Sequence, residues 1–170
     1  MLGRAPIVDF DGTVASLPVD WSQLRSRLGV DRIDDLWRAE SPGWDEVTRA
    51  ECAAATVAPE VEVVTGQLAR SEGCAILTSN SERAVEVFLS RTPSLAPQVR
   101  TVVGRETLSG PKADFETFRR GFDRCVQFTA AIRGTEPIVY VGDQTYEIDF
   151  AERLGAQAFI VENGAIRKWS

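Results

Sequence analysis

Five short runs of apolar and β-branched residues alternate with helical patterns along this chain of 170 residues. The runs end in Gly, Asp or Asn and cover residues 7–12, 74–80, 99–104, 137–143 and 156–163. Between them, apolar residues recur at helical spacing over residues 59–73, 81–91, 112–132 and 146–154. Strands that alternate with helices form a parallel sheet whose two faces are both covered. We therefore predict a Rossmann-like α/β fold, with a parallel five-stranded sheet and helices on both faces.

Residues 16–57 separate the first predicted strand from the helix that returns to the sheet, and they contain no strand pattern. Their helical patterns cover residues 20–29, 31–39 and 44–57. Since a crossover needs only one helix, we predict that residues 16–57 form a small helical cap inserted after the first strand. Residues 1–15 and 58–170 would then form the core domain. The tryptophans of the cap are expected to pack it against the core: Trp21, Trp37 and Trp44.

The charge and the cysteines exclude several classes of protein. The formal net charge is −6, whereas a surface for nucleic acid or an anionic membrane would need a basic patch. No apolar run reaches the length of a membrane span, and the N-terminus does not have the pattern of a signal peptide. Cys52, Cys74 and Cys125 are isolated and odd in number, which is typical of a reducing compartment. We expect a cytoplasmic protein that binds neither nucleic acid nor membranes.

The absence of histidine from the sequence limits the chemistry that is possible. It excludes Ser-His-Asp and Cys-His catalysis and the commonest zinc sites. What remains is catalysis by carboxylates, hydroxyls, lysine, arginine or a hard metal ion that binds oxygen ligands.

Polar residues stand at the ends of the predicted strands. Asp9 and Asp11 follow the first strand, Thr78, Ser79 and Asn80 end the second, and Asp143 ends the fourth. The motif DFDGT taken alone could be a turn that needs Asp and Gly for its backbone geometry. Ligands of parallel sheets bind at the carboxyl ends of the strands, however, and these residues all meet at that edge. The sequence therefore predicts one binding site there.

Four motifs in order make the chain resemble the haloacid dehalogenase superfamily of phosphotransferases over its whole length. DFDGT at residues 9–13 matches the first motif of the superfamily, and Thr78 matches the second. Lys112 in SGPKADFETF matches the third, and Gly142-Asp143 with Glu147 matches the fourth. Two details depart from the usual pattern. Glu147 stands where relatives usually carry Asp. Pro111 comes before Lys112, whereas in relatives a proline more often comes after this lysine.

The resemblance implies a magnesium site beside a nucleophilic carboxylate. Asp9 would be the nucleophile and would form an aspartyl-phosphate. Mg²⁺ would be held by the carboxylate of Asp9, the backbone carbonyl of Asp11 and the carboxylate of Asp143, with Glu147 reaching the ion through water.

The resemblance also implies how the phosphoryl group is held and how its ester bond is cleaved. Lys112 and Thr78 would bind the phosphoryl oxygens, together with Ser79 and Asn80 of the same loop. Asp11 would protonate the leaving oxygen and then take a proton from water. Relatives that cleave carbon–halogen or carbon–phosphorus bonds lack an acid at this position, because their leaving groups need no such proton. Asp11 thus favours hydrolysis of phosphate esters.

We predict a Mg²⁺-dependent phosphatase that hydrolyses small phosphorylated metabolites and resembles phosphoglycolate phosphatases. Two alternatives stay open: a phosphomutase or other phosphotransferase with the same residues, and a catalytically inactive phosphate-binding module. Phosphomutases usually carry a larger cap than residues 16–57. An inactive module would be expected to lose Asp9, Asp11 or Lys112, and this sequence keeps all three. The sequence indicates neither the physiological substrate nor the oligomeric state.

Overall fold

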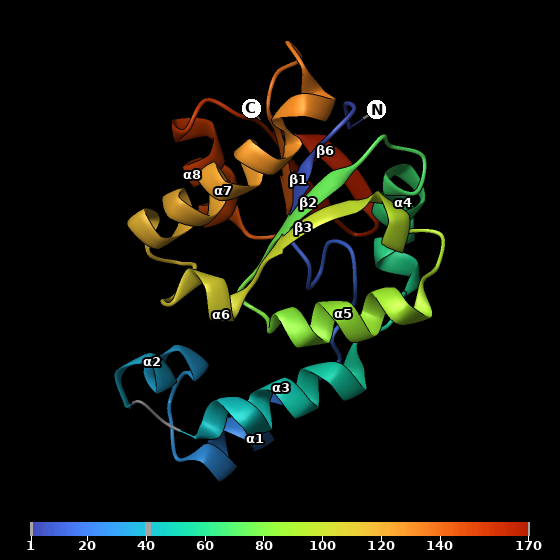
Figure 1. Cartoon of the computed structure of the whole chain (residues 1–170). Helices are drawn as coiled ribbons and strands as arrows, with labels where there is room; N and C mark the ends of the chain where they lie inside the picture. Colours follow the sequence, from blue (N-terminus) through green and yellow to red (C-terminus); the bar gives the residue numbers. More distant parts are fainter. Residues whose placement is uncertain (1, 40–41, 170) are drawn as a thin grey trace.

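A six-stranded sheet lies at the centre of the computed structural model, which describes residues 2–39 and 42–169 (Figure 1). The strands are β1 (Ile7–Val8), β2 (Cys74–Leu77), β3 (Val99–Val103), β4 (Val139–Gly142), β5 (Gln157–Glu162) and β6 (Ala165–Lys168). Their order is β3-β2-β1-β4-β5-β6, and all neighbours are parallel except β5 and β6. The predicted α/β fold with a parallel sheet is confirmed, but the predicted number of five strands is wrong.

The strand that the prediction missed, β6, forms an antiparallel hairpin with β5. The two residues between these strands, Asn163 and Gly164, both have positive φ angles, of 50° and 73°. Asn-Gly is the residue pair that tight hairpin turns of this kind prefer. This dipeptide was therefore the available signal for a sixth strand at the edge of the sheet.

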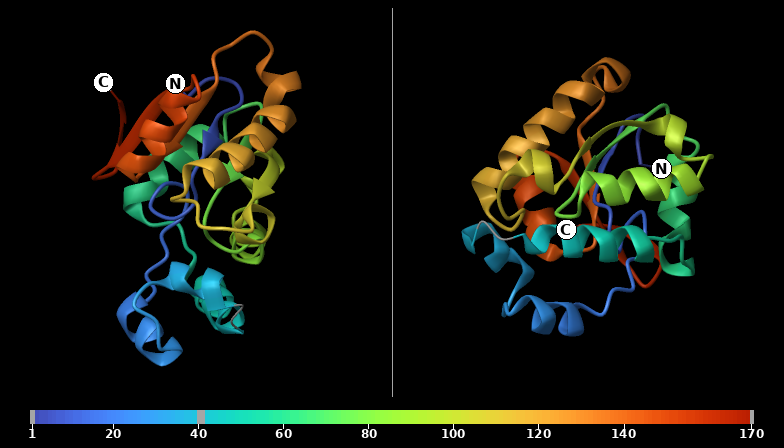
Figure 2. Two further views of the ribbon diagram at one scale, coloured as in Figure 1. Left: turned by 90° about the vertical axis from the view of Figure 1, so that its left-hand side faces the viewer. Right: turned by 60° about the horizontal axis from the view of Figure 1, so that its bottom comes forward.

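Helices cover both faces of the sheet, as predicted (Figures 1 and 2). They are α4 (Pro59–Leu68), α5 (Glu82–Arg91), α6 (Arg105–Leu108), α7 (Phe115–Arg133) and α8 (Thr145–Arg153), with a short 3-10 turn η2 (Ala96–Gln98) before β3. Two apolar clusters fill the space between helices and sheet. Leu68 of α4 and Phe88 of α5 belong to one of them, and Phe118 of α7 and Ile148 of α8 belong to the other.

Strand β1 lies in the middle of the sheet, where both of its faces are buried. Ile7 is opposite Ala75 of β2 and Tyr140 of β4, and all three pack in the cluster under α7 and α8. The next residue, Val8, packs in the cluster on the opposite face. Because side chains alternate along a strand, this explains why the apolar run is continuous. It also means that the residues after Val8 emerge between β2 and β4.

The described part of residues 16–57 contains helices and no strand of the sheet. The elements are α1 (Trp21–Leu28), the 3-10 turn η1 (Ile33–Asp35), α2 (Leu36–Ala39) and α3 (Gly43–Ala54). α1 begins and ends as predicted, because the Asp20 side chain accepts a hydrogen bond from the backbone N–H of Gln23 and Gly29 adopts a left-handed conformation with φ 68°. Residues 40 and 41 of the predicted cap lie outside the described residues.

These helices pack around a small apolar cluster of their own, formed by Leu24, Leu36 and Val47. The segments that enter and leave this region pair with each other, since Ser16 and Thr56 exchange backbone hydrogen bonds of 2.8 and 3.1 Å. Figures 1 and 2 show the region as a layer beside the carboxyl edge of the sheet, with α3 running alongside α5. We keep the name cap for residues 16–57. That the cap is a separate unit stays a prediction. No helix among the described residues has the length and apolarity needed to cross a membrane.

Candidate active site

The turn after β1 brings two carboxylates to the carboxyl edge of the sheet. The backbone N–H of Asp9 donates to the carbonyl of Val141 in β4 at 2.8 Å, which continues the parallel pairing by one residue. The chain then turns at Gly12, whose φ of 75° suits glycine. A Cβ atom at Gly12 would lie 2.5 Å from a carboxylate oxygen of Asp143, so this glycine also lets the first and fourth strand ends approach each other. Asp11 belongs to the same turn and is half-buried.

A buried lysine joins the first, third and fourth predicted motifs. The Nζ atom of Lys112 lies 2.5 Å from Oδ1 of Asp9 and 2.8 Å from Oε1 of Glu147. Burial alone would lower the pKa of Lys112, but the negative charges of Asp9 and Glu147 raise it above its usual value. Lys112 is therefore a fixed positive charge beside the carboxylate that the sequence predicts as nucleophile.

The carboxylate of Glu147 is held by two tyrosines as well as by Lys112. Tyr140 of β4 donates to Oε2 at 2.9 Å, and Tyr146 of α8 donates to Oε1 at 3.1 Å. A Cβ atom at Gly142 would lie 2.6 Å from Oε2, so glycine is needed at the end of β4 for this close approach. Both oxygens of Glu147 thus have partners, and its buried side chain fixes the position of the Lys112 ammonium.

Asp9, Asp143 and Glu147 form an acidic cluster that could hold a metal ion. One carboxylate oxygen of each lies within 4.8 Å of the others. Burial and the charge of Glu147 raise the pKa of Asp9 well above its usual range, although Lys112 opposes the rise. Burial also raises the pKa of Asp143. Several carboxylates that face one ammonium leave an excess of negative charge, which a hard divalent cation would offset.

Asp11 differs from Asp9 in its surroundings. Its Oδ1 atom accepts a hydrogen bond from the backbone N–H of Leu17 at 3.0 Å, which orients the carboxyl group. Burial raises the pKa of Asp11 to about 6, against the stabilising effect of that hydrogen bond. A carboxyl group with such a pKa can give up and take back a proton near neutral pH.

The loop after β2 holds the remaining predicted residues. Thr78 is fully buried, and its hydroxyl donates to Oδ1 of Asn80 at 2.8 Å. The backbone N–H of Asn80 donates back to the Thr78 hydroxyl at 3.1 Å. Ser79 is exposed and, like Asn80, lines the cavity described below. Thr78 lies behind this lining, so in the structure its hydroxyl is turned toward the loop itself.

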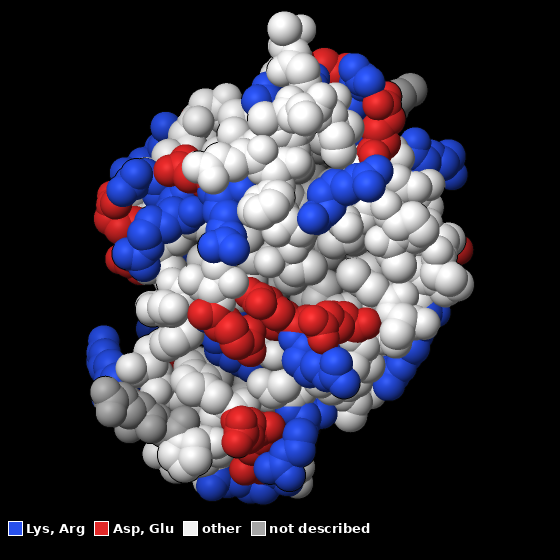
Figure 3. Space-filling view, in the orientation of Figure 1, with Lys and Arg blue, Asp and Glu red and all other residues white. Residues whose placement is uncertain are grey.

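A cavity of about 330 Å³ lies between the cap and the acidic cluster. All the predicted site residues except Thr78 and Lys112 line it. The cap contributes a largely apolar wall with one cationic and two acidic side chains: Trp21, Arg25, Ile33, Asp34, Trp37, Trp44 and Glu51. In Figure 3 the surface is hollowed on its left side between core and cap, and acidic side chains gather over α5 and α6.

The tryptophans of the cap have two roles. Trp21 and Trp44 pack against the apolar cluster of the cap, and the rings of Trp37 and Trp44 lie 4.9 Å apart. All three also line the cavity. The sequence predicts that they pack the cap against the core; the structure places Trp21 and Trp44 on the cluster inside the cap and all three on the cavity wall, because aromatic side chains of a small cap can cover its own cluster and the cavity at once.

Three further residues of the site were not predicted. Arg105 follows β3 and is 4% exposed, and its guanidinium forms an ion pair with the buried Glu51. Glu51 stands on the apolar face of α3, four residues after Val47, and an acid in such a position was the available signal. Tyr146 follows the apolar spacing of α8, and nothing in that spacing shows that its hydroxyl bonds to Glu147.

Known proteins are similar to this chain in structure and not in sequence. No protein-family model matches the chain, and no curated protein sequence matches it. A protein from Bacteroides fragilis assigned as a haloacid dehalogenase-like hydrolase is 18% identical, with a TM-score of 0.58 over 92% of this chain and 86% of its own.

Two more solved structures have the same arrangement. A dehalogenase with an intermediate complex is 14% identical, with a TM-score of 0.57 over 95% of this chain and 85% of its own. A protein from Clostridium difficile assigned as a phosphatase is 15% identical, with a TM-score of 0.55 over 93% of this chain and 84% of its own. At such identities the likeness establishes the fold, and this chain has the fold of the haloacid dehalogenase-like hydrolases.

Proposed function

We propose that this protein is a Mg²⁺-dependent phosphatase that hydrolyses small phosphate monoesters through an aspartyl-phosphate at Asp9. The observation that carries the proposal is the contact between the carboxylate of Asp9 and the ammonium of Lys112, in an acidic cluster at the floor of a covered cavity. An anionic nucleophile can approach an anionic phosphoryl group only where positive charge offsets their repulsion. The arrangement of Asp9, Lys112 and Glu147 meets that requirement.

In the first step, a carboxylate oxygen of Asp9 forms a bond to phosphorus while the ester P–O bond breaks. Asp11 gives its proton to the departing oxygen, so that the product leaves as an alcohol. Water then attacks the phosphorus of the aspartyl-phosphate, and Asp11 takes a proton from it. Inorganic phosphate leaves and the carboxylate of Asp9 is restored. A pKa of about 6 suits Asp11 to both halves of this cycle.

The residues around Asp9 fit a magnesium ion. Asp9, Asp143 and Glu147 supply oxygen donors, which suit a hard cation, and the missing Cβ atom at Gly12 lets the carboxylate of Asp143 lie close to the turn after β1. Asp9 and Asp143 would hold the ion directly together with the backbone carbonyl of Asp11. Glu147 would take part through water, because both of its oxygens already accept hydrogen bonds. When bound, Mg²⁺ would supply charge that stabilises the transferring phosphoryl group.

The size of the cavity favours small substrates, in agreement with the predicted similarity to phosphoglycolate phosphatases. A volume of about 330 Å³ is at the lower end of the range of small-molecule sites. The second candidate is a phosphotransferase such as a phosphomutase, which needs the same residues. Its acceptor would be a hydroxyl group of a sugar in place of water.

A phosphate-release screen tests the proposal directly. Purified protein with Mg²⁺ would be given sugar phosphates, phosphoglycolate, nucleotides, phosphoamino acids and p-nitrophenyl phosphate. A phosphatase releases inorganic phosphate from at least one of these, and release stops on chelation of the metal. Phosphate that appears on a second sugar in place of free phosphate would identify a phosphotransferase. No turnover of any ester would contradict both candidates and leave the inactive binding module.

A further inference from the structure

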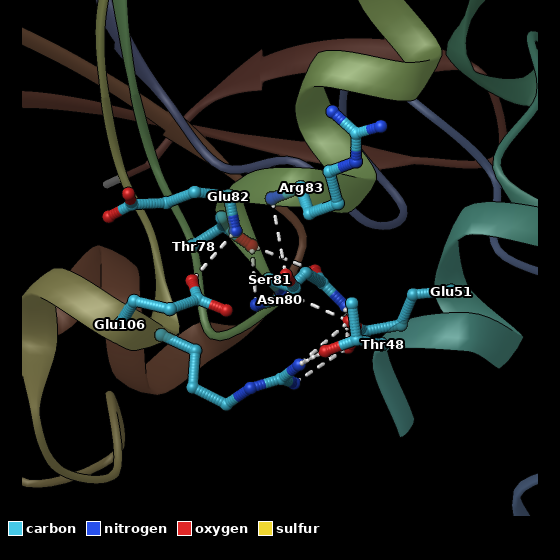
Figure 4. A network of polar contacts seen from close by, with 9 residues as sticks. Thr48, Glu51, Thr78, Asn80, Ser81, Glu82, Arg83 and Glu106 are labelled. Atoms are coloured by element: carbon cyan, nitrogen blue, oxygen red, sulfur yellow. Dashed lines mark hydrogen bonds and ion pairs between the residues drawn. The ribbon is translucent and has the colours of Figure 1, made fainter. Parts of the chain in front are cut away.

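The carboxylate of Glu51 connects the cap to the loop after β2. Glu51 belongs to α3 and is 1% exposed. Its Oε1 accepts from Nδ2 of Asn80 at 3.1 Å, and its Oε2 accepts from the backbone N–H of Ser81 at 3.0 Å. Two further hydrogen bonds, of 3.0 and 3.1 Å, come from the guanidinium of Arg105. Figure 4 shows Glu51 of α3 facing Asn80 and Ser81 of this loop. A buried carboxylate with four donors is fully satisfied.

Three side chains on one face of α3 contact the guanidinium of Arg105. Trp44, Thr48 and Glu51 recur at helical spacing, so their side chains point the same way. The Arg105 guanidinium lies 4.5 Å from the centre of the Trp44 ring, and its Nη2 donates to the Thr48 hydroxyl at 2.7 Å. The backbone N–H of Arg105 donates to the carbonyl of Asn80 at 2.9 Å. The loop is thus bonded on one side to the cap and on the other to the start of α6.

Glu51 also decides how the amide of Asn80 is oriented. An ionised carboxylate can only accept hydrogen bonds, so the Asn80 NH₂ group must face Glu51. The Oδ1 atom of Asn80 then faces the hydroxyl of Thr78, which donates to it. The Asn80 amide therefore links the Glu51 carboxylate of the cap to the buried Thr78 hydroxyl at the end of β2, so a shift of Glu51 would change the hydrogen bond of Thr78.

We propose that Glu51 of the cap is a positioning residue. It holds the loop of Thr78, Ser79 and Asn80 in the position in which this loop binds the phosphoryl group. The inference rests on the proposed function, in which this loop holds phosphoryl oxygens. Preorganised donors stabilise a transition state only where their positions are already fixed before the reaction. The carboxylate of Glu51, which belongs to the cap, would thereby raise the rate of phosphoryl transfer without contacting the phosphorus of the substrate.

Two variants test the role, with a control on the same helix. Glu51→Gln keeps the length of the side chain but removes the charge. Glu51→Asp keeps the charge beside Arg105 but is too short to reach Arg105 and the loop together. Glu46→Gln removes the exposed bond of 2.8 Å between Glu46 and Arg27 inside the cap and leaves the loop unchanged. Each chain is assayed on p-nitrophenyl phosphate with Mg²⁺, and backbone hydrogen exchange is followed at Asn80 and Ser81.

We expect kcat to fall by about tenfold or more in both Glu51 variants, because a small misplacement of a reacting group has an effect of that order or larger. The Ser81 amide should exchange slowly in the wild type and faster in both variants. The control should match the wild type in both measurements. A shift of the unfolding midpoint with an unchanged kcat would overturn the inference, because it would show a structural role alone.

Other outcomes also decide between the two proposals. Fast exchange of the Ser81 amide in the wild type would overturn the inference even if no variant folds. A wild type that turns over no phosphate ester would contradict the proposed function itself. An active wild type whose Glu51 variants keep full kcat would contradict only the positioning role.

Discussion

The ammonium of Lys112 lies 2.5 Å from a carboxylate oxygen of Asp9, and both side chains are almost completely buried. The two residues are 103 positions apart in the sequence: Asp9 follows β1 directly, and Lys112 lies between α6 and α7. A buried pair of this kind is strongly destabilised when one partner is removed, because the other charge stays buried without compensation. The pair therefore has consequences for stability as well as for catalysis, and the two can be measured separately.

Lys112→Met should lower the free energy of unfolding by about 3–5 kcal/mol and abolish turnover. The variant leaves Asp9 and Glu147 buried together without a cation between them. Lys168, the other lysine of the chain, is exposed on β6, and Lys168→Met is the matched control. Denaturant unfolding of the three chains gives the comparison. A Lys112→Met chain as stable as the control would show that the pair is unimportant for folding.

Mg²⁺ should raise the unfolding temperature of the wild type, because the acidic cluster exists only in the folded chain. Asp143→Asn removes one carboxylate of the cluster and should lose most of this shift together with Mg²⁺-dependent turnover. Asp149→Asn, which changes an exposed residue of α8, is the control and should behave as the wild type does. Thermal unfolding with and without Mg²⁺ measures the shift. Activity that survives exhaustive chelation would disprove the metal assignment.

Asp11→Asn should lower kcat/KM for some substrates more than for others. An alkyl phosphate needs a proton on its leaving oxygen, whereas p-nitrophenolate leaves easily without one. We expect kcat/KM to fall by about 100-fold or more for an alkyl phosphate, and clearly less for the first step of p-nitrophenyl phosphate cleavage. Rapid-mixing measurement of p-nitrophenolate release separates that step from the release of phosphate. Equal losses for both leaving groups would rule out Asp11 as the general acid.

Trp37→Ala should change the preference among substrates and leave the chemical step intact. Trp37 lines the cavity from the cap, and its ring packs on that of Trp44. We expect KM for esters with bulky apolar groups to rise by about tenfold, with little change for the smallest esters, because the substitution removes apolar surface from the cavity wall. A panel of phosphate esters compared between the two chains checks this. An unchanged ranking would mean that Trp37 does not touch the substrate.

The parallel sheet and the acidic cluster could be predicted from the sequence because both depend on local order along the chain. Apolar runs locate the strands, and the carboxyl ends of parallel strands meet at one edge. That Asp9 and Asp143 lie near each other follows from the adjacent positions of β1 and β4, whereas the ion pairs of Lys112 with Asp9 and Glu147 come from the loop after α6 and from α8. The edge strand β6 was missed, although the Asn163-Gly164 dipeptide that forms its turn was visible.

The network of Glu51 could not be predicted in the same way. Its partners lie 29, 30 and 54 positions away in the sequence, at Asn80, Ser81 and Arg105. No spacing rule connects the cap with the strand ends, because their relative placement is decided by packing of whole helices. The same reason explains why the buried position of Arg105 could not be predicted, since its partner carboxylate comes from the cap.

The formation of an aspartyl-phosphate is the central claim, and acid quenching tests it most directly. Asp11→Asn should accumulate the intermediate from p-nitrophenyl phosphate, because the residue that activates water is gone while the leaving group needs no acid. The quenched chain is digested and analysed by mass spectrometry. We predict one added phosphoryl group on the peptide that contains Asp9, and none in Asp9→Asn under the same conditions. A wild type that releases phosphate while Asp9 never carries a phosphoryl group, or while Asp9→Asn turns over at a similar rate, would contradict the account.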